Sequence, residues 1–354
     1  MEKINNKEDL IIQDFDVRDP YLIRMSDDEV FYLNEEGIKI ADENKGKWFL
    51  SSSGPIYLPN HNVYYSMFTD RNRGVISSEV QEDIRNTRFI IFGVGSTGGD
   101  FATMIAQMGA ENILIADMDQ LDASNLNRQH GSFRDIGKNK TDIVARRIWD
   151  INPYVNVEIF TKQITPIDVD KIIGENTSLR RIILLAMDDK DSIIEVHSKA
   201  KENSIPVFMA TDIGHAAHLA IFDYSKSDTK IFNGKFSLDE AKKSSLLEFV
   251  AKFIKIKDLP NEYLDAAKGM LKGELEVIPQ LTTASKKAGA KTVEEVISYF
   301  EGRKSKSYKM HNTRKAQSTR RQRLQDLLKK PKKIIELAKL KKALSKSQNK
   351  SNTF

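Results

Sequence analysis

The 354-residue chain contains no cysteine. It can therefore form no disulfide and no Cys-ligated zinc or iron–sulfur site, and it has no thiolate to act as a nucleophile. Its six histidines show no HExxH spacing, the pattern by which one helix presents two zinc ligands. We therefore expect no zinc, and chemistry that depends on oxygen and nitrogen groups or on a bound cofactor.

Long hydrophobic runs are also missing. The longest unbroken apolar run near the middle, Ile182 to Met187, has six residues, whereas a membrane-spanning helix needs about 20. The first residues are polar and acidic and lack the apolar region of a signal peptide. We expect a cytoplasmic protein that does not cross a membrane.

Charge is distributed unevenly along the chain. Residues 303–354 hold eighteen lysines and arginines against two acidic residues, a net charge of +16, so the preceding residues carry −11. Three interpretations of this tail remain open: neutralising the phosphates of RNA or another nucleic acid, docking on an acidic partner or on the chain's own acidic body, or a partly disordered, solubilising end. Aromatic residues are nearly absent after Tyr308, which disfavours stacking on bases.

The apolar residues, 40% of the chain, suffice for a sizeable core. Residues 1–68 contain short β-like runs between turns and predict a small β-rich region. From Arg88 onward, apolar runs alternate with segments of helical spacing, which is typical of an α/β fold. We predict a Rossmann-like, mainly parallel sheet with helices on both faces over residues 69–302, and a basic helical or partly disordered tail over residues 303–354.

A glycine-rich turn, Gly93-Val94-Gly95-Ser96-Thr97-Gly98, lies between an apolar run and a predicted helix. Glycines in that position allow a tight turn and let backbone N–H groups approach a phosphate at a helix N-terminus. Asp117 follows the next apolar run, 24 residues after Gly93, where a carboxylate can bind ribose hydroxyls. Alone, this pattern indicates a nucleotide without identifying it, and an NAD-dependent oxidoreductase or a plain glycine turn would also fit.

Two cations close behind Asp117 favour a triphosphate over a dinucleotide. Arg128 lies in Ser124-Asn125-Leu126-Asn127-Arg128-Gln129, and Lys140 ends Gly137-Lys138-Asn139-Lys140. Transfer of an α-phosphoryl group requires positive charge on the non-bridging oxygens and on the departing pyrophosphate. A dinucleotide needs no such cations there, so we predict ATP rather than NAD.

Together these motifs resemble the ThiF/MoeB/HesA superfamily, the adenylating enzymes related to ubiquitin-activating enzymes. The resemblance extends from about Asp70 to Tyr224 and includes Asn72-Arg73, the glycine turn, Asp117-Met118-Asp119, the SNLNRQ and GKNK segments, Ile151-Asn152-Pro153, and Asp188 placed 18 residues before Pro206. It implies ATP and Mg²⁺ as cofactors and a homodimeric assembly. It departs from the family's pattern in lacking the paired zinc cysteines of many relatives, and in having Leu185 where an acidic residue is often found.

The resemblance also implies roles for individual residues. It implies contacts with ATP for Gly93, Gly95, Ser96, Gly98, Asp117, Asp119, Asn125, Arg128 and Lys140. It associates Asp188 with Mg²⁺, and it implies that Arg73 reaches the ATP of the partner subunit. Arg128, Lys140, Asp188 and Arg73 are then the predicted catalytic residues.

The implied activity is ATP-dependent adenylation of a carboxylate, with release of pyrophosphate. A carboxylate is already ionised at neutral pH, so the attack needs no general base, and the protein supplies positioning and charge neutralisation. We expect the substrate to be the C-terminus of a small protein or peptide, activated without a cysteine thioester. Two alternatives remain: a relative that cyclises a threonylcarbamoyl group on tRNA, which the basic tail supports, and a catalytically silent peptide-binding scaffold.

Overall fold

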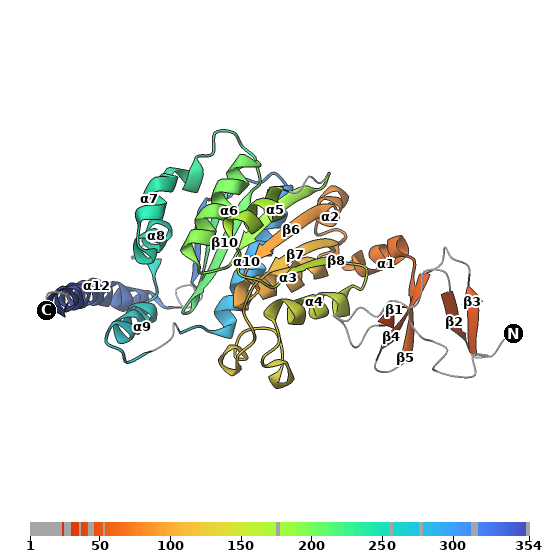
Figure 1. Cartoon of the computed structure of the whole chain (residues 1–354), viewed down its shortest axis with the longest axis horizontal. Helices are drawn as coiled ribbons and strands as arrows, with labels where there is room; N and C mark the ends of the chain where they lie inside the picture. Colours follow the sequence, from red (N-terminus) through yellow and green to blue (C-terminus); the bar gives the residue numbers. More distant parts are fainter. Residues whose placement is uncertain are drawn as a thin grey trace.

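The computed structural model describes residues 23–24, 30–34, 37–41, 46–51, 54–174, 178–254, 258–275, 279–312 and 318–351. A seven-stranded sheet forms the centre of the molecule, and helices flank it (Figure 1). Its strands are β6 (Thr87–Phe92), β7 (Asn112–Ala116), β8 (Asn156–Phe160), β9 (Arg180–Leu185), β10 (Val207–Ile213), β11 (Ala216–Phe222) and β12 (Tyr308–Asn312).

The strands lie in the order β12-β11-β10-β9-β6-β7-β8. Strands β6 to β10 are parallel, whereas β11 runs antiparallel to both of its neighbours. The chain thus moves outward from β6 to β8 on one side, then returns to place β9 and β10 on the other. In a sheet of this kind, ligands bind at the carboxyl ends of the strands, in the crevice where the order reverses. That crevice lies between β6 and β9.

Helices cover both faces of the sheet, as the apolar runs predicted. One buried cluster packs α2 (Ser78–Arg85), α3 (Ser96–Gln107), α4 (Lys140–Ile151) and α10 (Thr282–Phe300) on one face. The other packs α5 (Pro166–Gly174), α6 (Lys190–Glu202), α7 (Leu238–Lys243) and α8 (Leu246–Phe253) on the opposite face. All side chains of β6 are buried, because a central strand covered on both sides meets no solvent. The predicted mainly parallel α/β sheet is therefore confirmed.

The basic segment after residue 302 begins inside this fold. Strand β12 pairs antiparallel with β11 from Tyr308 to Asn312 and so forms one edge of the sheet. Further along, α12 (Arg320–Ser351) is a long helix that packs on α9 (Asn261–Leu271), at one end of the molecule in Figure 1. The three-part division of the chain remains a prediction, and part of the segment assigned to the tail contributes a strand to the central sheet.

About half of the predicted β-rich region, residues 1–68, lies outside the described residues, so this region remains a prediction. Its described parts are the strands β1 (Ile23–Arg24), β2 (Val30–Asn34), β3 (Gly37–Ala41), β4 (Gly46–Ser51) and β5 (Gly54–Pro59), and the helix α1 (His61–Phe68). Strand β4 pairs with β1 and β5, and β2 pairs with β3. Within the described part of the chain, no helix has the length and apolar character needed to span a membrane.

Candidate functional site

A cavity of about 400 Å³ opens at the carboxyl ends of β6, β7, β9 and β10, at the crevice where the strand order reverses. The predicted residues that line it are Gly93, Gly95, Ser96, Asp117, Asp119, Asn125, Arg128, Lys140 and Asp188. These residues come from segments up to 95 positions apart in the sequence. The structure therefore brings most of the predicted site together in one place.

Two glycines of the turn, Gly93 and Gly98, pack so closely that a side chain would not fit. Gly93 has φ +85°, and a Cβ there would lie 2.7 Å from the Ala186 carbonyl oxygen. A Cβ on Gly98 would lie 1.8 Å from the carbonyl oxygen of Gly93. Helix α3 begins at Ser96, within this segment, and among the described residues no side chain caps its N-terminus. Its first backbone N–H groups are therefore free of a side-chain acceptor and suit an anion in the cavity.

Asp117 connects the glycine turn to the segment that follows β7. Its Oδ2 accepts a hydrogen bond from the Val94 backbone N–H at 2.8 Å, and its Oδ1 accepts one from the Asp119 backbone N–H at 2.9 Å. Burial raises the pKa of Asp117. Each carboxylate oxygen can accept more than one hydrogen bond, so these two bonds leave acceptor capacity for the predicted ribose hydroxyls. That contact remains a prediction.

The two predicted cations are held by the protein. Lys140, the first residue of α4, is buried, and its Nζ lies 2.7 Å from Asp119 Oδ2. Arg128 is partly buried, and its Nη1 donates to the Ser124 carbonyl at 2.9 Å and to Asn127 Oδ1 at 2.8 Å. Neither cation is a freely solvated surface charge, and both line the cavity.

Asp188 follows β9 at the edge of the cavity and is exposed. Its neighbour Asp189 caps α6, since its Oδ2 accepts from the Ser192 backbone N–H at 2.8 Å. In the part of the chain that the structure describes, no three or more His, Asp or Glu side chains form a metal-binding group. Mg²⁺ in nucleotide sites is typically bound by one or two carboxylates together with phosphates. Asp188 fits that arrangement, in which most ligands come from the nucleotide.

Arg73 does not line this cavity. Its side chain is 70% exposed, forms an ion pair with Asp70 at 3.3 Å, and donates to Ser66 Oγ at 3.1 Å. A contact with the nucleotide of a partner subunit requires an exposed arginine, and Arg73 is one. The contact itself remains a prediction.

Lys162, Asp212 and Gln280 also line the cavity, although none of them was predicted as a site residue. Asp212 is only 6% exposed; its Oδ1 accepts from the hydroxyls of Ser96 and Thr97 at 3.4 Å each. Burial raises the pKa of Asp212. Lys162 lies two residues after β8 and Asp212 lies near the end of β10, so the position of the strand ends could have identified them. Gln280 carries no such signal in the sequence.

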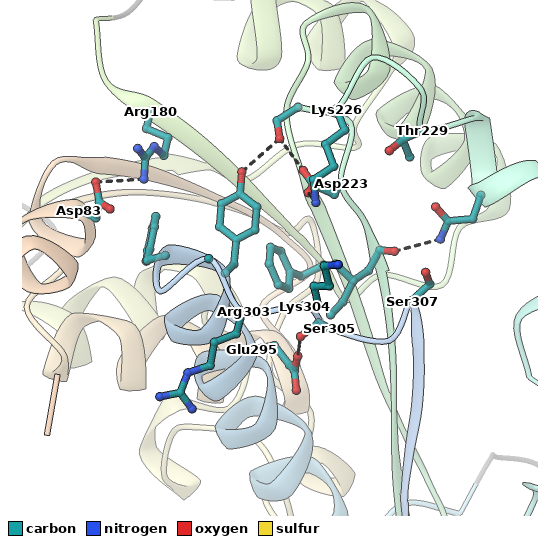
Figure 2. Close-up of a pocket in the computed structure, with 17 residues that line it drawn as sticks. Asp83, Arg180, Asp223, Lys226, Thr229, Glu295, Arg303, Lys304, Ser305 and Ser307 are labelled. Carbon is teal, nitrogen blue, oxygen red and sulfur yellow. Dashed lines mark hydrogen bonds and ion pairs between the residues drawn. The ribbon is translucent and has the colours of Figure 1, made fainter. Parts of the chain in front are cut away.

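A second cavity, of about 730 Å³, lies on the amino-terminal side of β9 and β10 (Figure 2). Two ion pairs lie within its wall, and the wall holds similar numbers of acidic and basic side chains. Arg180 contacts Asp83 at 3.0 Å, and Lys226 contacts Asp223 at 2.6 Å. Because the charges of the wall largely neutralise one another, the cavity provides no strong selection for an anion or a cation, and we assign it no ligand.

Comparison with known proteins agrees with this geometry. Residues 69–333 match the family described as the ThiF family. The chain is 38% identical over 88 residues to the tRNA threonylcarbamoyladenosine dehydratase of Bacillus subtilis, covering 25% of this chain and 35% of that protein. It is 35% identical over 101 residues to a probable molybdopterin-synthase adenylyltransferase of Porphyra purpurea, covering 28% of this chain and 26% of the relative. The chain thus spans about a third or less of the length of the curated relatives that it matches.

Among solved structures, the chain resembles the tRNA N6-threonylcarbamoyladenosine dehydratase of E. coli in complex with AMP. The TM-score is 0.50 at 16% identity, and the match covers 69% of this chain and 98% of that one. At this identity the similarity shows a common fold.

Proposed function

The chain belongs to the ThiF family, and on this premise we propose that it is an ATP-dependent adenylyltransferase that activates a carboxylate. One observation carries the proposal. At the crevice between β6 and β9, an uncapped helix N-terminus, two held cations and an exposed carboxylate line one cavity. Backbone N–H groups and cations favour phosphate groups, and the carboxylate favours a metal ion bound to them.

In the proposed reaction, a carboxylate oxygen of the substrate attacks the α-phosphorus of ATP. A new oxygen–phosphorus bond forms, the bond to the bridging oxygen breaks, and pyrophosphate leaves with the electron pair. Arg128 and Lys140 neutralise the charge that develops on the phosphate oxygens and on the leaving group. Asp188 would hold Mg²⁺, which supplies further charge neutralisation when bound. The glycine turn lets the backbone approach the phosphates closely.

We propose the C-terminal carboxylate of a small protein or peptide as the substrate. The chain has no cysteine and so cannot form a cysteine thioester; we propose that the acyl-adenylate passes to a nucleophile from outside the chain or from the substrate itself. We further propose a homodimer in which Arg73 of each subunit reaches the nucleotide of the other. Its 70% exposure and its position outside the cavity support a role across an interface rather than within one subunit.

The second candidate is modification of a carboxyl group on RNA. The basic segment favours it, because eighteen cations over residues 303–354 would attract phosphates. The two candidates differ in a measurable way. Adenylation on an RNA should weaken steeply with salt, by orders of magnitude between about 50 and 200 mM if six or more phosphates are contacted. Adenylation of a peptide should show no such dependence.

Calorimetry with ATP and Mg²⁺, and separately with NAD, tests the nucleotide. We expect micromolar binding of ATP and none of NAD. If the protein binds NAD and does not bind ATP, the proposal is refuted in favour of an oxidoreductase. ATP binding without pyrophosphate exchange, for any peptide or RNA supplied, would instead favour the silent scaffold.

A further inference from the structure

We infer that Gln280 is a positioning residue, whose side-chain amide holds the guanidinium of Arg128 in the orientation that presents Nη2 to the nucleotide cavity. The inference rests on the proposed function, because it concerns how Arg128 meets the phosphates of ATP. No sequence motif includes Gln280, which lies 152 residues after Arg128.

The amide of Gln280 bridges two charged side chains. Its Oε1 accepts a hydrogen bond from Arg128 Nε at 2.6 Å, and its Nε2 donates one to Asp212 Oδ1 at 3.2 Å. A carboxylate only accepts and a guanidinium only donates. Each end of the amide therefore meets the one kind of partner it can satisfy, and the buried carboxylate of Asp212 determines that the carbonyl end faces Arg128.

The backbone around Gln280 is held as well. Gln280 forms an isolated β-bridge with Gly214, in the turn between β10 and β11. Two residues later, the Thr282 hydroxyl donates to the Asn127 carbonyl, next to Arg128. The same Asp212 oxygen accepts from the hydroxyl of Ser96 in the first turn of α3. The network therefore connects Arg128 to the helix N-terminus on which the phosphates would rest.

These contacts leave one edge of the guanidinium for a ligand. Nε is bound to Gln280, and Nη1 is bound to Ser124 and Asn127. Within the described residues, Nη2 makes no hydrogen bond. Because the guanidinium is planar and rigid, fixing Nε and Nη1 also fixes the direction of Nη2. Without the Gln280 contact the guanidinium could rotate, and Nη2 would no longer be held toward the cavity.

The test compares the dissociation constants of Mg·ATP and AMP in wild type, Gln280→Met, Arg128→Ala and the double variant. Methionine keeps the volume of glutamine but removes both polar contacts. We expect Gln280→Met to weaken ATP binding about tenfold, because one hydrogen bond to a charged group contributes about that much. Its effect on AMP binding should have the same sign as the effect of Arg128→Ala. The double variant should be no weaker than Arg128→Ala within about twofold, because residues that act through one another are not additive. Gln163→Met makes the same change elsewhere on the cavity wall. Any loss of ATP affinity that it causes should add to the loss caused by Arg128→Ala.

Additive losses in the double variant would overturn the inference, as would unchanged ATP binding in Gln280→Met when Arg128→Ala weakens it. If wild type fails to bind ATP, or Arg128→Ala binds it normally, the proposed function or its assignment of Arg128 fails instead. Should Gln280→Met not fold, the ¹⁵N signal of Arg128 Nε in wild type, assigned by its loss in Arg128→Ala, provides the second measurement. A slowly exchanging Nε–H supports the contact, and a rapidly exchanging one refutes it.

Discussion

Adding one methyl group at Gly98 should weaken nucleotide binding by about 10²-fold while leaving the fold in place. The Cβ of Gly98→Ala would lie 1.8 Å from the Gly93 carbonyl oxygen and 3.0 Å from its carbon. An ordinary contact needs about 3.4 Å or more, so the turn and the start of α3 must separate by more than an ångström. A displacement of about 1 Å in a positioned site costs on the order of 10²-fold. We expect ATP affinity to fall by about that factor.

The effect on stability should be smaller than the effect on binding. Overpacking costs about 1–3 kcal/mol, and replacing glycine by alanine within a helix recovers about 0.5–1 kcal/mol. Calorimetric titration with Mg·ATP and a thermal melt measure the two effects separately. Gly269→Ala is a matched control, because its Cβ would lie 3.1 Å from the flexible side chain of Leu275, and neither residue lines the cavity. Near-normal ATP binding by folded Gly98→Ala would show that close packing of this turn does not form the binding site.

Three further outcomes are expected. With a cognate substrate supplied, Asp188→Asn should abolish pyrophosphate exchange, and Arg128→Ala should lower its rate about 10²-fold or more. Near-normal exchange in both variants would mean that these two positions are wrongly assigned. Burial lowers the pKa of His197 to about 3 and that of His218 to about 4. As the pH falls, these histidines are protonated in the unfolded chain before they are protonated in the folded one. The free energy of unfolding should therefore fall below about pH 6.5, by roughly 1.4 kcal/mol per pH unit for each histidine. Urea unfolding at pH 7 and 5.5 measures this pH dependence, and a Gln substitution at either position that leaves the pH dependence unchanged would contradict the prediction. Removal of residues 318–354 should keep ATP affinity within a few-fold by the same titration, whereas a truncated protein that no longer binds ATP would make α12 part of the binding site.

The central part of the site could be predicted because its signals are local. A glycine turn needs glycines at fixed spacing, as the close approach of Gly98 to Gly93 shows. The carboxyl ends of parallel strands meet at one edge of a sheet, which brings Asp117 and Asp188 to the same cavity. Continuous apolar runs identify strands buried on both faces, and β6 is such a strand.

The rest of the wall depends on contacts that no local pattern encodes. Gln280 lies just before α10, which packs beside α3, and its side-chain bridge to Asp212 joins residues 68 apart. A single glutamine without a motif gives no reason to expect this. Nor did the polar composition of Tyr308–Asn312 indicate a strand, because β12 is an edge strand whose side chains are only partly buried. Edge strands need no continuous apolar run, so hydrophobic periodicity does not detect them.

The net positive charge of the tail does not by itself identify what the tail binds. Some of its charges meet the chain's own body: Lys268 Nζ lies 2.5 Å from Glu336, and Lys333 pairs with Asp265. These contacts are of the kind expected if the basic segment docks on the body of the chain, which is one of its three interpretations. Exposed ion pairs contribute only about 0–1 kcal/mol each and weaken with salt. They can orient α12 along α9 without neutralising it, because Arg320, Arg321 and Arg323 remain exposed. The helix can therefore rest on its own body and still present positive charge to a polyanion, so docking on the body does not decide between a peptide and an RNA substrate. The salt dependence of catalysis, rather than the position of the tail, distinguishes them.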